Sequence, residues 1–196
     1  GRTPVATTPD PTARGRGRFV VDLVEALGLD RPWIVGHSMG GVVASAAVDM
    51  APEAFRGIGF VASQGLEPNA MMRKTPFGLL DRLLRFPILG RAMAPINRRA
   101  FASTGFRGYS DAELYRTIHV VAHTDIDAHA DRIIGLNLPT LVAWSDDDPL
   151  IAAAISRELA EACPDGPRLH FTTGGHNLQK TRAAEIAAAL LAECHR

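Results

Sequence analysis

Ser38 is the residue of this sequence best suited to chemistry, because it lies at the centre of the stretch Gly36-His37-Ser38-Met39-Gly40. A serine hydroxyl is a weak nucleophile at neutral pH, so it needs a base within hydrogen-bonding distance and donors for the oxyanion that forms. Flanking glycines permit a tight turn that exposes the hydroxyl. The stretch predicts a serine nucleophile, and a glycine turn with an incidental serine is the alternative.

An acid and a base for this serine occur further along the chain. Asp146, Asp147 and Asp148 follow one apolar run, and His176 lies in a glycine-rich turn after another. A serine nucleophile can be followed along the chain first by the carboxylate that orients its base and then by the histidine base itself. This sequence has that order. We therefore expect His176 to be the base and one of the three aspartates to orient it.

Short apolar runs predict the strands that position these residues: 32–38, 56–63, 139–145 and 168–173. Helical patterns alternate with them over 18–29, 39–50, 152–163 and 177–194, whereas the first 17 residues have the composition of a loop. This alternation indicates an α/β protein with a parallel sheet that helices cover on both faces. The candidate residues all follow strand ends, so we expect them to meet at one edge of the sheet.

The turn at Ser38 also predicts a site for negative charge. The backbone N–H of Met39 stands at the start of the following helix, where it would point toward a developing oxyanion. Side chains at Gly36 and Gly40 are expected to collide in so tight a turn.

The composition argues against several kinds of partner. The chain has 196 residues with 21 acidic and 21 basic side chains, so no net charge would attract nucleic acid. No apolar run approaches the roughly 18 residues that a membrane span needs. We expect a cytoplasmic protein with a small-molecule partner, no nucleic acid and no membrane span.

The motifs "GHSMGG", "LVAWSDDDPLI" and "GGHNL" together resemble the α/β-hydrolase superfamily, in its cap-bearing serine esterase or lipase-like branch. The resemblance implies Ser38 as nucleophile, His176 as base and Asp148, which precedes a proline and a leucine, as the orienting acid. It implies an ester or related acyl substrate and no cofactor. A C–C bond hydrolase or an acyltransferase could use the same residues, and a non-catalytic binding module or inactive fragment is the alternative from another class.

The resemblance also implies a division of the chain. Residues 1–64 and 139–196 would form the hydrolase core, and residues 65–138 a mostly helical cap insertion. Phe77, Leu80 and Phe101 are candidates to line a substrate pocket there, although such residues more often bury a cap against the main domain.

Hydrolases of this superfamily carry about four strands before the helix that precedes the nucleophile strand, and this sequence shows none of them. The opening Gly1–Pro4 resembles the end of a loop that follows the fourth of those strands. We therefore expect a fragment, with an exposed edge strand open to self-association or to a missing N-terminal segment. Loss of the upstream oxyanion donor would cost roughly 10²–10³ in rate.

His119 and His123 stand four residues apart, with Asp125, Asp127 and His129 nearby. Zinc sites use such spacing on a helix. The glutamate of a His-Glu-x-x-His motif is absent, so we expect no metal site and assign these histidines to the cap.

Overall fold

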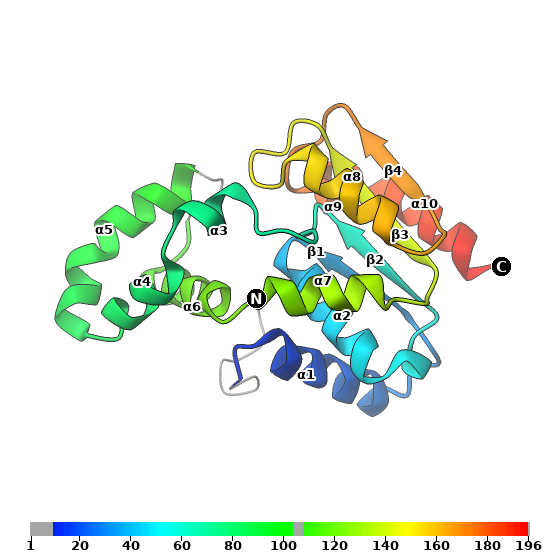
Figure 1. Cartoon of the computed structure of the whole chain (residues 1–196), viewed down its shortest axis with the longest axis horizontal. Helices are drawn as coiled ribbons and strands as arrows, with labels where there is room; N and C mark the ends of the chain where they lie inside the picture. Colours follow the sequence, from blue (N-terminus) through cyan, green and yellow to red (C-terminus); the bar gives the residue numbers. More distant parts are fainter. Residues whose placement is uncertain (1–9, 104–107, 196) are drawn as a thin grey trace. The chain divides into compact units, whose positions relative to one another are not determined.

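The computed structural model describes residues 10–103 and 108–195 (Figure 1). Gly1–Pro4, whose likeness to a family loop was noted above, lies outside them. The chain divides into two compact units. The first, the core unit, comprises the chain up to Asn69 and from Asp125 onward, and the second, the helical unit, is Ala70–Thr124.

A parallel sheet forms the centre of the core unit. Its strands are β1 Trp33–His37, β2 Gly57–Val61, β3 Thr140–Ser145 and β4 Arg168–Phe171, in the order β1-β2-β3-β4. The predicted strands and the α/β class are therefore confirmed. Every residue of β2 and β3 is buried, as expected for central strands covered on both faces. β1 is an edge strand of the sheet within the described part of the chain.

Helices cover the two faces of this sheet (Figure 1). On one face lie α1 Ala13–Ala26, α2 Met39–Met50, α7 Ile126–Ile134 and α8 Ala153–Ala162, with the short 3-10 helix Pro52–Ala54 after α2. Ile58 and Phe60 of β2 pack on this side. On the other face α9 Leu178–Thr181 and α10 Ala183–Cys194 bury Leu141 and Ala143 of β3. The alternation of side chains along each strand thus supplies two hydrophobic cores.

The start of α1 differs from the sequence prediction, which treated the first 17 residues as a loop. The helix begins at Ala13, and the Thr12 hydroxyl caps it by accepting a hydrogen bond from the Gly15 N–H at 3.1 Å. A Cβ on Gly17 would lie 2.9 Å from the backbone nitrogen of Ala47, so the glycine permits close contact between α1 and α2. Composition alone assigns Gly17 to a loop, but its place in a helix is explained by the packing of α1 against α2.

The C-terminal helix also differs, because the predicted helix 177–194 is interrupted at Arg182. This residue has φ −128°, outside the helical range, and separates α9 from α10. Its guanidinium donates hydrogen bonds to the Thr173 carbonyl at 3.1 and 2.7 Å and lies over the Phe171 ring. These contacts hold Arg182 against the end of β4 instead of within a continuous helix.

The helical unit contains α3 Ala70–Lys74, α4 Phe77–Leu84, α5 Pro87–Ser103 and α6 Asp111–Ala122. Its own core consists of Phe77, Phe101, Leu114, Ile118 and Val121. The unit lies within the predicted insertion 65–138, whose remaining residues belong to the core unit. Whether it acts as a cap stays a prediction.

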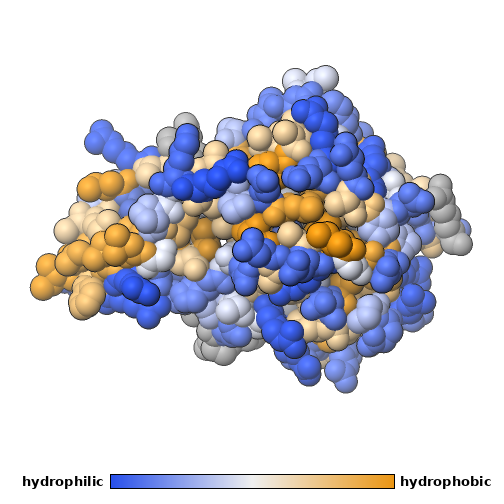
Figure 2. Space-filling view, viewed as in Figure 1, coloured by the Kyte–Doolittle hydropathy of each residue, from blue (hydrophilic) through white to orange (hydrophobic). Residues whose placement is uncertain are grey.

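The surface of the helical unit includes exposed apolar side chains, among them Ile88 and Ile96 of α5. Figure 2 shows hydrophobic residues on the part of the surface that this unit forms. None of the described helices is long and apolar enough to cross a lipid bilayer.

Candidate active site

Ser38 occupies the turn between β1 and α2 in a strained backbone conformation. Its φ is 54° and its ψ is −125°, and a non-glycine residue at positive φ is uncommon. Such a conformation costs on the order of 1–3 kcal/mol and persists only where its surroundings enforce it. Here the Ser38 N–H donates to the Val61 carbonyl at 3.0 Å, and the Ser63 hydroxyl donates to the Ser38 carbonyl at 3.1 Å. The turn therefore has the strained geometry expected at a nucleophile.

The glycines around Ser38 have different roles. A Cβ on Gly36 would lie 2.4–2.5 Å from backbone atoms of Gly40 and Gly41, so a side chain is excluded there. The expected collision at Gly40 was wrong, because a Cβ there would meet nothing within 4 Å. Gly41 is the second constrained position, since its Cβ would lie 1.9 Å from the Ser63 hydroxyl oxygen. All three glycines stand in the sequence, but only the structure shows that Gly36 and Gly41 must lack a side chain and that Gly40 need not.

Asp148 and His176 meet in the core unit although 28 residues separate them in sequence. The Nδ1 atom of His176 lies 2.9 Å from Oδ2 and 3.1 Å from Oδ1 of Asp148. Both side chains are buried: that of His176 is 9% exposed and that of Asp148 is 2% exposed. Asp148 Oδ1 also accepts hydrogen bonds from the Leu150 and Ile151 N–H groups. An ionised carboxylate in this position requires Nδ1 to carry the proton, which leaves the lone pair on Nε2.

The other ring nitrogen of His176 is the unusual atom of the site. Nε2 is buried and has no hydrogen-bond partner among the described residues. No hydrogen bond joins it to the Ser38 hydroxyl in this structure. A buried polar atom without a partner is costly, and catalytic hydrogen bonds commonly tighten only when substrate binds. The arrangement can accept a proton at Nε2, but the complete Ser38–His176–Asp148 relay stays a prediction.

Sequence reasoning missed the residues that hold the loop carrying His176. Asp147, one of the three aspartates considered as the orienting acid, instead accepts hydrogen bonds from the Gly174 and Gly175 N–H groups at 2.9 and 2.8 Å. The bond from Gly175 is the main reason why the pKa of Asp147 lies below its usual value. The Ser145 hydroxyl donates to the Gly175 carbonyl at 3.0 Å. The run of three aspartates was the available signal, but it does not say which amides each would meet.

His37 is a further support for the same loop. Its Nε2 lies 2.8 Å from the His176 carbonyl oxygen, and the two rings are 4.9 Å apart. Burial lowers the pKa of His37, and the hydrogen bond to the His176 carbonyl offsets this lowering only in part. The neutral form of the ring is therefore favoured. A neutral ring with its proton on Nε2 donates this bond without placing positive charge beside His176. Asp146, the remaining aspartate of the run, pairs with His170 at 2.9 Å.

Met39 is the first residue of α2, so its N–H belongs to the four amides that have no acceptor within the helix. Its position directly after Ser38 matches the expected oxyanion donor, a role that stays a prediction. Phe77 and Phe101 are buried, and both belong to the core of the helical unit, with Leu80 packed against it. They support that unit, and a role in binding substrate stays untested.

The residues considered for a metal ion have separate environments. His129 is buried in the core unit, with Nδ1 2.8 Å from the Ser45 hydroxyl and Nε2 3.3 Å from the Gln64 carbonyl. Asp125 caps α7 by accepting from the Ala128 N–H at 2.9 Å, and Asp127 is exposed. His119 and His123 lie together in the helical unit, His119 in the last turn of α6 and His123 as its C-cap.

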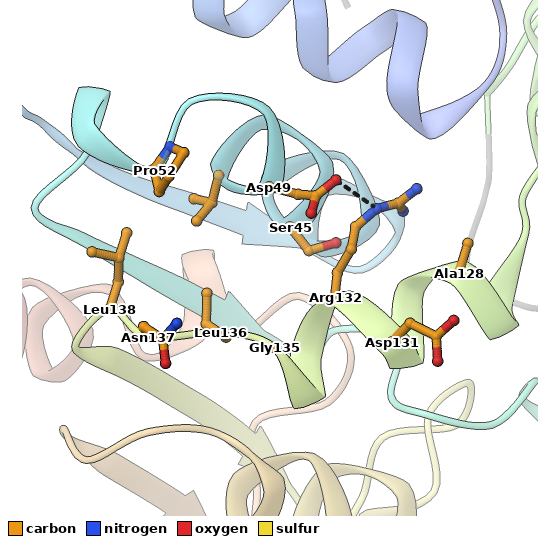
Figure 3. Close-up of a pocket in the computed structure, with 11 residues that line it drawn as sticks. Ser45, Asp49, Pro52, Ala128, Asp131, Arg132, Gly135, Leu136, Asn137 and Leu138 are labelled. Atoms are coloured by element: carbon orange, nitrogen blue, oxygen red, sulfur yellow. Dashed lines mark ion pairs between the residues drawn. The ribbon is translucent and has the colours of Figure 1, made fainter.

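A pocket of about 440 Å³ opens elsewhere in the core unit, between α2 and α7. Figure 3 shows Ser45 and Asp49 of α2 facing this region opposite Arg132 of α7, which lies 3.7 Å from Asp49. Neither Ser38 nor His176 lines it. The pocket is therefore not part of the candidate active site.

The sheet topology and the strained serine turn together define an α/β-hydrolase fold. The sequence profile of a family described as "Alpha/beta hydrolase family" matches residues 1–189, and the chain belongs to this family. A protein of Caulobacter sp. (strain K31) named "Putative carbamate hydrolase RutD" is 27% identical over 97% of this chain and 75% of its own length. "Uncharacterized hydrolase YugF" of Bacillus subtilis (strain 168) is 21% identical over 90% and 70%.

Solved structures agree with this fold. The enzyme Est816, described as degrading N-acyl homoserine lactones, superposes with a TM-score of 0.65 at 22% identity, over 98% of this chain and 78% of its own. The enol-lactonase of Burkholderia xenovorans LB400 gives 0.66 at 20% identity, over 94% and 74%. Likenesses at this level of identity establish the fold and leave the substrate open.

Proposed function

We propose that this protein is a serine hydrolase that cleaves an ester or related acyl bond of a small molecule. The observation that carries the proposal is the buried imidazole of His176, whose Nδ1 is bonded to Asp148 while Nε2 has no partner among the described residues. An activated serine needs a base that is oriented in this way. The His176 backbone is hydrogen-bonded to His37, the residue next to Ser38.

In the proposed reaction Ser38 attacks the acyl carbon while His176 Nε2 accepts the hydroxyl proton. Asp148 keeps the ring oriented and stabilises the imidazolium that forms. The Met39 N–H donates to the oxyanion, after which His176 returns the proton to the leaving group. Water then attacks the acyl-enzyme with His176 again acting as base, which releases the acid and restores Ser38.

The names of the relatives support the reaction class. They mention lactone, enol-lactone and carbamate substrates, and all of these offer an acyl carbon to a serine nucleophile. The common chemistry is therefore nucleophilic attack at an acyl carbon, with specificity set by groups outside the proposed triad.

The test is a substrate panel of p-nitrophenyl butyrate, an N-acyl homoserine lactone and an aryl carbamate. We expect turnover of at least one of these substrates. Ser38→Ala should lower the kcat for that substrate by on the order of 10⁶, because the residues of a triad act as a unit. Ser156→Ala, which removes a serine hydroxyl of α8, is the matched control and should retain most activity. Turnover by Ser38→Ala at the parental rate would refute the proposal, as would turnover of none of the three by the parental chain.

A further inference from the structure

A second cluster of reactive side chains lies in the helical unit, apart from the residues of the proposed reaction. Asp81 of α4, His119 of α6 and His123, the C-cap of α6, each offer one ligand atom, and these three atoms lie within 4.8 Å of one another. His119 lies in the last turn of α6, and His123 directly follows this helix as its C-cap. Their ring centroids are 4.4 Å apart.

Hydrogen bonds fix which nitrogen of each ring remains available. His123 Nδ1 lies 2.8 Å from the His119 carbonyl oxygen, and this oxygen can only accept, so Nδ1 carries the proton. His119 Nδ1 lies 2.8 Å from Asp81 Oδ1 and donates in the same way to the carboxylate. Both rings therefore present the lone pair of Nε2. No hydrogen bond in the described part of the chain uses either Nε2 atom.

This pattern is the one that metal-binding histidines show. A histidine that binds a metal through one nitrogen almost always donates its other N–H to a carboxylate or a backbone carbonyl, which orients the ring. Asp81 provides the first kind of acceptor and the His119 carbonyl the second. The sequence could not reveal this arrangement, because Asp81 lies 38 residues before His119.

Charge at the cluster both favours and limits a cation. Asp81 accepts hydrogen bonds at both carboxylate oxygens, from His119 at Oδ1 and from Arg85 at Oδ2. Its side chain is only 9% exposed. Arg85, whose side chain is 61% exposed, bonds Oδ2 at 2.8 Å and places a positive charge beside the cluster, which disfavours a cation there.

We propose that His119, His123 and Asp81 form a binding site for a borderline divalent cation of the zinc class. The Nε2 atoms of the two histidines are the ligands, Asp81 orients His119, and water completes the coordination. Zn–N bonds of about 2.0–2.1 Å place tetrahedral ligands roughly 3.3 Å apart, so the cluster, whose ligand atoms lie within 4.8 Å of one another, would contract slightly on binding. The bound ion would strengthen the connection between α4 and α6.

The test is isothermal titration of the full chain with zinc chloride. We expect a site that His123→Gln weakens by more than roughly a hundredfold, because loss of a ligand exceeds the ten- to hundredfold cost of losing a residue that only orients one. Among the described residues the His123 side chain hydrogen-bonds only to the His119 carbonyl, one turn earlier, so this variant should fold. His195→Gln, which removes an exposed histidine elsewhere, is the control and should bind zinc like the parent. Arg85→Gln should bind zinc more tightly, because it removes a positive charge next to the carboxylate that orients His119.

A spectroscopic measurement locates the ion independently of activity. In ¹⁵N-labelled protein, zinc should shift the Nε2 resonances of His119 and His123 and leave their Nδ1–H signals in place. Parental zinc affinity in His123→Gln would overturn the proposal. Loss of binding in His176→Gln alone would also overturn it, because the ion would then lie at the proposed active site. Either result would leave the cluster as a hydrogen-bonded clamp between α4 and α6.

Discussion

At the residue scale, Asp147 is the side chain whose contribution the structure changes most. It bridges two successive amides of the loop that presents His176, while the adjacent Asp148 bonds the ring itself. Two neighbouring carboxylates thus perform different tasks, one toward the backbone and one toward the imidazole. In the proposed mechanism Asp147 is a positioning residue, because it acts on the base only through the loop.

Asp147→Ala should lower kcat by about ten- to a hundredfold with little change in KM, because displacement of a catalytic group by about 1 Å has effects of this size. Asp147→Asn should recover part of the rate, since its amide oxygen still accepts a hydrogen bond. Asp146→Ala, which removes the carboxylate paired with His170, is the control and should keep the parental kcat. Equal kcat values for the parent and Asp147→Ala, measured by steady-state kinetics, would show that the loop holds its position without this carboxylate.

At the scale of elements, His129 joins α7 to α2 through Ser45 and to the loop after β2 through the Gln64 carbonyl. Burial lowers the pKa of His129 from 6.5 to about 4, and the hydrogen bond to Gln64 offsets this only in part. The folded protein therefore holds the ring neutral in a range where the unfolded chain would protonate it. The unfolded state binds more protons between these values, so stability falls as the pH is lowered through this window.

The parent should lose roughly 3 kcal/mol of unfolding free energy between pH 7 and pH 4 through this residue, at about 1.4 kcal/mol for each pH unit of the shift. His129→Gln lacks the titrating group, so its unfolding free energy should depend less on pH by that amount. Urea denaturation of both proteins across this range measures the difference. Parallel pH profiles would mean that His129 does not have its pKa lowered in the folded state.

At the scale of the whole molecule, the chain builds separate hydrophobic cores in its two units. The core unit buries residues on both faces of β2 and β3, whereas the helical unit has its own hydrophobic cluster around Phe77 and Phe101. A cavity made in the helical unit should therefore affect that unit first.

Phe77→Ala should destabilise the helical unit by about 3–5 kcal/mol, the usual cost of removing a buried phenylalanine. Hydrogen exchange should then accelerate in α4 and α6 while the amides of β2 and β3 keep their protection. Leu79→Ala, on the exposed side of α4, is the control and should leave exchange nearly unchanged. Equal acceleration in the sheet would show that the two units unfold as one.

The sequence was most informative where local pattern and fold agree. The strands, the turn at Ser38 and the order of Asp148 and His176 follow from apolar runs, glycines and the positions of strand ends. The start of α1 and the requirement at Gly41 could not be predicted, because both depend on close packing against distant segments. Asp147 and Asp81 were missed for a related reason, since their partners lie 27 or more residues away.

The central claim is that Ser38 is a nucleophile activated by His176. The most direct measurement is peptide mass spectrometry of the full chain after reaction with a fluorophosphonate, which labels activated serines. We predict a single adduct on Ser38, its loss in Ser38→Ala, and much slower labelling in His176→Ala. An unlabelled Ser38, or labelling that is equally fast without His176, would contradict the account.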